Sequence, residues 1–204
     1  MKIRYLSVLL SAALLLSGCA ENENSALQPY MIKAGNKAVD LLEPRSELEK
    51  QLGSKFDAED SFEVGKSVIV CGTYYGDFNG FDYSDFHPVF DQENSNRKKF
   101  ALYNGITVNT GKEQVETLLG DCIKFEGEST DYIECFVNGE EIDYSLVDTS
   151  DFSDVENEYS RYSQAARAYC AEQLDESESG NYVVICVSCY SDRDNDISVS
   201  VFKK

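Results

Sequence analysis

The strongest constraint on the fold is a pair of apolar segments near the C-terminal end of the chain. Every second residue of 183–189 and of 197–201 is apolar, and the six residues 191–196 between them are all polar or charged. Successive side chains on a strand point to opposite faces, and a short polar connection is typical of antiparallel neighbours. We therefore predict a terminal β-hairpin, and with it an antiparallel sheet that has a buried face.

Three other segments have the spacing of amphipathic helices. Residues 110–120 combine capping-box spacing at Thr110 and Glu113 with an apolar stripe and a terminal glycine. Residues 153–174 show the same start at Ser153 and Glu156, followed by a longer stripe. A further helix is predicted over 28–42.

The two halves of the chain show a weak internal similarity. Similar residues recur 67 positions apart, first as Leu48, Leu52 and Gly53 and then as Val115, Leu119 and Gly120. Predicted strands follow each set, at 62–75 in the first half and at 132–137 and 141–147, around an Asn-Gly turn, in the second. We predict two α+β repeats, 28–103 and 104–204, the second with an extra helix near 153–174. Chance similarity is the alternative.

The start of the second repeat resembles a known class of domain. The residues that carry the resemblance are 104–108 (NGITV), 112–115 (KEQV) and 119–120 (LG). They are similar to the helix-loop-helix opening of β-lactamase-inhibitor-protein-like domains and of small outer-membrane lipoproteins of the SmpA/OmlA group. The resemblance implies an α+β fold in which short helices pack on one face of an antiparallel sheet. It also implies binding to other proteins, in settings that differ between members.

The N-terminal segment has the features of an export signal. Lys2 and Arg4 precede an apolar stretch at 6–16, which as a helix rises about 16 Å and is too short to span a bilayer core of about 30 Å. Residues 16–19 (LSGC) resemble the lipobox of bacterial lipoproteins. This implies removal of a signal peptide, 1–18, and attachment of diacylglycerol and palmitate-type acyl chains to Cys19.

The lipobox resemblance also implies a location for the chain. Residues 19–27 are then a short polar tether that holds the domain close to a bacterial envelope membrane, on its extracytoplasmic side. Whether that membrane is an inner, outer or single one stays open.

The charge of the chain is strongly acidic. It has 37 acidic and 18 basic residues, which gives a net charge of −19 at pH 7. A charge of this sign repels phosphate backbones, so we expect no nucleic-acid partner.

Six cysteines follow Cys19 in the sequence. An even number in an exported protein favours disulfides, and free buried thiols are the alternative. The six are Cys71, Cys122, Cys135, Cys170, Cys186 and Cys189. Cys186 and Cys189 lie three apart in a predicted strand, where their side chains face opposite sides, which argues against a redox pair or half of a zinc site.

One set of aromatic residues is a candidate binding surface. Tyrosine-rich surfaces are favoured for recognition, because tyrosine buries a large area with few rotamers to immobilise. The set lies on the predicted reverse faces of the strands and comprises Tyr132, Phe136, Tyr182, Tyr190 and Phe202. The alternative is that this face packs on the first repeat or on the helix at 153–174.

The remaining motifs give weak support to other functions. Asp192, Asp194 and Asp196 alternate like the first ligands of a calcium loop, but Ile197 stands where such a loop needs glycine. No nucleophile, phosphate or dinucleotide motif is present in the sequence. We therefore predict a non-enzymatic protein-binding or envelope-assembly module without a cofactor. A calcium-binding envelope protein is the first alternative, and a cell-envelope enzyme is the second.

Overall fold

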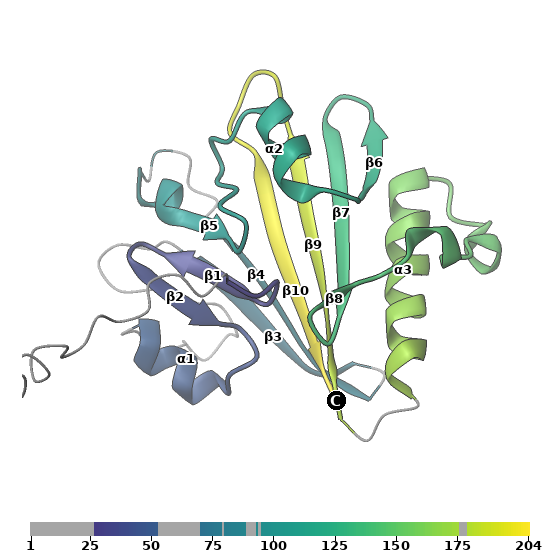
Figure 1. Ribbon diagram of the computed structural model, residues 1–204, viewed down its shortest axis with the longest axis horizontal. Helices are drawn as coiled ribbons and strands as arrows, with labels where there is room; N and C mark the ends of the chain where they lie inside the picture. Colours follow the sequence, from purple (N-terminus) through teal and green to yellow (C-terminus); the bar gives the residue numbers. More distant parts are fainter. Residues whose placement is uncertain (1–26, 53–69, 79, 89–92, 94, 176–178) are drawn as a thin grey trace, which may run out of the picture.

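A seven-stranded antiparallel sheet forms the centre of the protein (Figure 1). The computed structural model describes residues 27–52, 70–78, 80–88, 93, 95–175 and 179–204. The strand order is β3-β4-β10-β9-β7-β6, and β8 pairs with β7 beside this path. The strands are β3 (Val70–Phe78), β4 (Phe81–Pro88), β6 (Ile123–Glu126), β7 (Thr130–Val137), β8 (Glu140–Glu141), β9 (Asn181–Cys189) and β10 (Asp196–Lys203). The terminal hairpin is confirmed, since β9 and β10 pair from Ser188 opposite Asp196 to Asn181 opposite Lys203.

A second, three-stranded sheet is built from the N-terminal part of the described chain. Its order is β2-β1-β5, with β1 (Met31–Ala34), β2 (Lys37–Asp40) and β5 (Phe100–Leu102). The predicted helix over 28–42 is therefore wrong. The buried residues of this segment, Ile32, Ala34, Val39 and Leu41, repeat every second position on each side of a two-residue turn. Gly35 in that turn has φ 65°, a conformation that glycine adopts readily.

Three α-helices are present in the described chain: α1 (Arg45–Leu52), α2 (Lys112–Leu119) and α3 (Glu158–Asp175). The predicted capping boxes are not formed, although α2 and α3 are. The N-cap of α2 is Gly111, because the Thr110 hydroxyl accepts a hydrogen bond from the Thr107 N–H at 2.8 Å. The helix α3 begins later than predicted, where Asn157 Oδ1 accepts from the Ser160 N–H at 2.8 Å.

Short 3-10 turns connect several of these elements. They are η1 (Ser95–Lys99), η2 (Tyr144–Leu146) and η3 (Ser150–Phe152). The predicted strand over 141–147 is thus mostly η2 and irregular chain, because β8 ends at Glu141. The Asp143 side chain accepts from the Ser145 N–H and caps η2.

Both faces of the large sheet are covered. On one face, α1, α2 and the small sheet enclose a core that includes Leu48, Val115 and Ile185. On the other face, α3 packs on β7 and β9 through Ala166, Cys170 and Leu174. Figure 1 shows α3 on one side of the sheet, with the short helices and the small sheet on the other. The predicted α+β class with an antiparallel sheet is confirmed, and the long helix on the opposite face makes it a three-layer structure.

The two short helices occupy matching places in the chain. Each has eight residues, and β3-β4 follows α1 as β6-β7 follows α2. The two strand pairs lie at opposite edges of the same sheet, so the segments 28–103 and 104–204 share one core. No helix in the described ranges is long and apolar enough to cross a membrane. The predicted signal peptide, Cys19 and residues 62–69 of the predicted first-half strand lie outside the described residues.

Candidate functional site

The five predicted aromatic residues do not share one face of the sheet. The register puts Tyr132 opposite Val187 and Phe136 opposite Val183, whereas Tyr182 and Phe202 pair with each other on the reverse face. Four of the five side chains are at most 5% exposed, namely Tyr132, Phe136, Tyr182 and Phe202. Tyr132 and Phe136 are buried in the core that includes α2 and the small sheet, and Tyr182 and Phe202 are buried in the core under α3.

Tyr190 and the aspartates of the β9–β10 connection are held by arginines. The Arg193 guanidinium lies 3.7 Å from the centroid of the Tyr190 ring and 3.3 Å from Asp196. Arg97 lies 3.9 Å from Asp194. Within the described ranges, no group of three or more histidine, cysteine or acidic side chains is placed to hold a metal ion. Arginine side chains of the protein itself thus lie beside Asp194 and Asp196, two of the three predicted calcium ligands.

The six described cysteines are all free thiols, so the expected disulfides are not formed in this structure. The Cys135 thiol, on β7, is hydrogen-bonded to that of Cys170, on α3, and burial contributes to the raised pKa of Cys135. Cys186 and Cys189 face opposite cores, as their spacing predicted. Burial raises the pKa of Cys189 to about 11, which disfavours the reactive thiolate.

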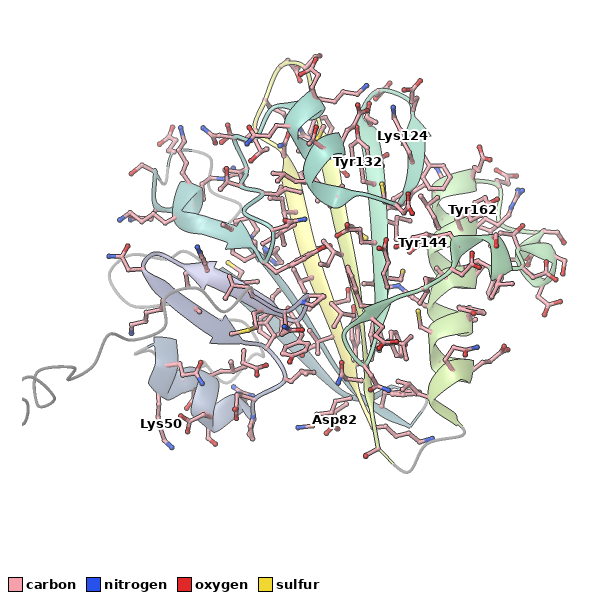
Figure 2. The ribbon with its side chains drawn as sticks, viewed as in Figure 1. Lys50, Asp82, Lys124, Tyr132, Tyr144 and Tyr162 are labelled. Carbon is pink, nitrogen blue, oxygen red and sulfur yellow. The ribbon has the colours of Figure 1, made fainter. Side chains whose placement is uncertain are left out.

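A cleft of about 650 Å³ lies between the edge strand β6, the turn η2 and the first turns of α3. Its size is that of an ordinary ligand site. Figure 2 shows Lys124 on β6, Tyr144 in η2 and Tyr162 on α3 around this region. The residues that form its walls include Ile123, Phe125, Asp131, Tyr144, Tyr159 and Tyr162. The cleft combines aromatic and charged side chains.

The aromatic wall of the cleft is ordered by ring contacts. The Phe125 ring lies edge-on to Tyr159, with centroids 5.6 Å apart and planes at 81°, and 5.6 Å from Tyr162 at 55°. Two hydroxyl groups are fixed toward the protein: Tyr144 accepts from the Cys135 N–H at 2.9 Å, and Tyr159 is hydrogen-bonded to the Cys186 thiol. The cleft is therefore a preformed site rather than a loose gap between elements.

The electrostatic character of the cleft is acidic. Glu126, Asp131 and Glu158 line it. Lys124 is the one basic side chain among its described lining residues, and its ammonium lies 2.8 Å from Glu116 and 3.0 Å from Glu126. Those two carboxylates raise the pKa of Lys124 and neutralise its charge. A positively charged ligand group would find acceptors here.

The cleft was missed by sequence reasoning, although one signal for it is present. Residues 125–160 contain twelve acidic residues and not one lysine or arginine. This segment supplies β7, η2 and the approach to α3, and three of its acidic residues, Glu126, Asp131 and Glu158, line the cleft. Tyr159 and Tyr162 lie within the helix predicted near 153–174, and no role was predicted for Phe125 or Tyr144.

A second unusual group is the buried carboxyl of Glu134, in the core between β7 and the short helices. It is 1% exposed; Oε2 accepts from the Tyr103 hydroxyl at 3.3 Å, and Oε1 has no hydrogen-bond partner. Burial, and then the negative charge of Glu141, raise the pKa of Glu134 to about 8. Glu134 is not among the residues that line the open pocket of about 560 Å³ beside Glu141, Asp121 and Cys122.

No protein family, curated protein sequence or solved structure matches this chain. The geometry of the cleft and the N-terminal sequence are therefore the basis for the function proposed below.

Proposed function

We propose that this chain is a lipid-anchored, extracytoplasmic protein-binding module, and that the cleft between β6 and α3 is its binding site. The observation that carries the proposal is an aromatic wall and an acidic rim in one preformed cleft. Aromatic side chains at a concave site supply most of the affinity of many protein contacts, and charged rims supply orientation and specificity. The buried carboxyl that has a raised pKa lies outside this cleft, which supports binding over catalysis.

The matched placement of α1 and α2 supports a more specific fold. Both are eight-residue helices whose first residues are 67 positions apart, and each precedes an antiparallel strand pair. We propose that they represent a tandem repeat of the β-lactamase-inhibitor-protein-like kind, with α3 as an addition to the second repeat.

Lipidation at Cys19 is the basis for the proposed location. The Cys19→Ser variant is expected to move the protein from the membrane fraction to the soluble fraction and to abolish palmitate labelling, because two acyl chains are needed for stable anchoring. Cell fractionation and mass spectrometry of the N-terminal peptide measure both effects. A Cys71→Ser variant is the control and should stay membrane-bound. Unchanged fractionation of Cys19→Ser would contradict the anchor.

Photo-crosslinking in the native cell tests the cleft as a protein-binding site. We expect p-azidophenylalanine in place of Tyr162, which lines the cleft, to give one dominant protein adduct. The same group in place of Gln164, an exposed residue of α3 that does not line the cleft, is the matched control and should give none. A folded, anchored protein without an adduct at position 162 would contradict the proposal.

A further inference from the structure

The strand β6 forms an edge of the large sheet. The strand β6 has β7 on one side, and none of the described strands pairs with its other side. In an antiparallel pair, about half of the backbone N–H and C=O groups of an edge strand point away from its neighbour. Such groups can hydrogen-bond to an added strand, which is a recurring mode of peptide recognition.

The cleft lies on the side of β6 that faces α3. Phe125 of β6 is paired opposite Asp131 of β7, so both side chains share this face of the sheet. Tyr159 and Tyr162 rise from α3 beside the Phe125 ring. A strand added along β6 would therefore direct every second side chain toward an aromatic wall.

The negative charge around the cleft favours an added segment that carries a positive charge. The stretch 125–160, with twelve acids and no lysine or arginine, contributes Glu126, Asp131 and Glu158 to the cleft. Lys124 is paired with Glu116 and Glu126, so Asp131 and Glu158 supply the net negative charge of the lining. A second copy of this chain would bring the same acidic segment into contact with itself, which like-charge repulsion disfavours.

We propose that the cleft binds an extended, lysine- or arginine-rich polypeptide segment, which pairs with β6 as an additional strand and places alternate apolar side chains against Phe125 and Tyr162. This inference rests on the proposed function of the cleft and adds the chemistry of the bound segment. Backbone hydrogen bonds to β6 supply affinity, the aromatic wall selects alternating apolar residues, and the acidic rim selects basic ones.

The probe is a fluorescein-labelled peptide of alternating lysine and valine, about twelve residues long, titrated with the mature protein and followed by fluorescence anisotropy. We expect saturable binding that weakens about tenfold or more between about 50 mM and about 500 mM salt. The glutamate-valine peptide should not bind. A lysine-valine peptide N-methylated at every residue keeps the charge and the side chains but cannot donate backbone hydrogen bonds, and it should bind at least about tenfold more weakly.

A charge-reversal pair of variants assigns the binding to the cleft. Glu126 and Glu158 are exposed residues that line it, whereas Asp151 and Asp154 are exposed residues outside it. We expect Glu126→Lys with Glu158→Lys to weaken binding of the lysine-valine peptide about tenfold or more. Asp151→Lys with Asp154→Lys changes the net charge equally and should alter binding by about twofold or less. Circular dichroism verifies that both proteins are folded.

The outcomes separate this inference from the proposed function. Equal binding of the N-methylated peptide, or equal effects of the two double variants, would show attraction to a charged surface and would overturn strand addition. Absence of peptide binding would also overturn it, yet a protein adduct at position 162 would still support the cleft as a binding site. Dimers in sedimentation that the Glu126→Lys, Glu158→Lys variant loses would make the cleft a contact between two copies, which overturns the inference as well.

Discussion

Glu134→Gln is expected to stabilise the protein at alkaline pH and to remove a large part of the pH dependence of its unfolding. The pKa of Glu134 is raised from 4.5 to about 8 in the folded state, because burial disfavours the charged carboxylate. Below the pKa that Glu134 has in the unfolded chain, its carboxyl is protonated and the folded state has its full stability. That stability is lost as the pH rises through the higher pKa of Glu134 in the folded state. For a shift of this size, the loss between pH 4.5 and pH 8 is about 3–5 kcal/mol.

Urea denaturation followed by circular dichroism at pH 5 and pH 8.5 measures this effect, since the chain has no tryptophan to report unfolding by fluorescence. At pH 8.5 the variant should be more stable than the wild type by about 2–4 kcal/mol, and at pH 5 the two should differ by about 1 kcal/mol or less. Glu140→Gln, at an exposed position on β8, is the control and should follow the wild type. A difference between Glu134→Gln and wild type that does not change with pH would refute the assignment.

Phe202→Ala is expected to lower the free energy of unfolding by about 3–5 kcal/mol, because it leaves a cavity in the core under α3. The Phe202 ring is fully buried and stacks on Tyr182 at 4.1 Å and on Tyr83 at 4.4 Å between centroids. The Arg167 guanidinium lies 5.5 Å from the centroid of the Phe202 ring. Removal of the Phe202 ring therefore disrupts three side-chain contacts at once.

Chemical denaturation at neutral pH measures the loss, with Tyr190→Ala as the comparison. Tyr190 is partly exposed and contacts Arg193 just after β9. We therefore expect Tyr190→Ala to lower the free energy of unfolding by about 1 kcal/mol or less. Comparable, small losses for both variants would mean that the aromatic face of β10 is open to solvent and that α3 does not cover it.

The sequence predicted those parts of the fold that depend on local patterns. The β9–β10 hairpin has alternating apolar residues and a polar connection, and both are read within about twenty residues of chain. The segment 28–42 was misjudged because its two strands are only four residues long, so the few apolar positions fit a helix as well as a hairpin. The N-caps of α2 and α3 were misplaced by one to four residues for a similar reason, since several polar residues compete for that position.

The candidate site depended on information that is not local. The face on which Tyr132 lies relative to Tyr182 is set by the register between β7 and β9, and a shift of one residue reverses it. The cleft depends also on strand order, which leaves β6 at an edge beside α3. Composition indicated an acidic region in 125–160, but only the three-dimensional arrangement brings Phe125, Tyr144 and Tyr162 around the same space.

The order of strands in the large sheet has a consequence for how the chain reaches its native state. The last two strands in the sequence, β9 and β10, lie in the middle of the sheet, and a hydrogen bond between Ser200 and Asp85 joins residues 115 positions apart. Closing such long loops slows folding. The chain is synthesised from its N-terminus. The sides of β4 and β7 that pair with β10 and β9 therefore have no partner until residues 181–203 have been made. The large sheet can therefore be completed only after residues 181–203 have been synthesised.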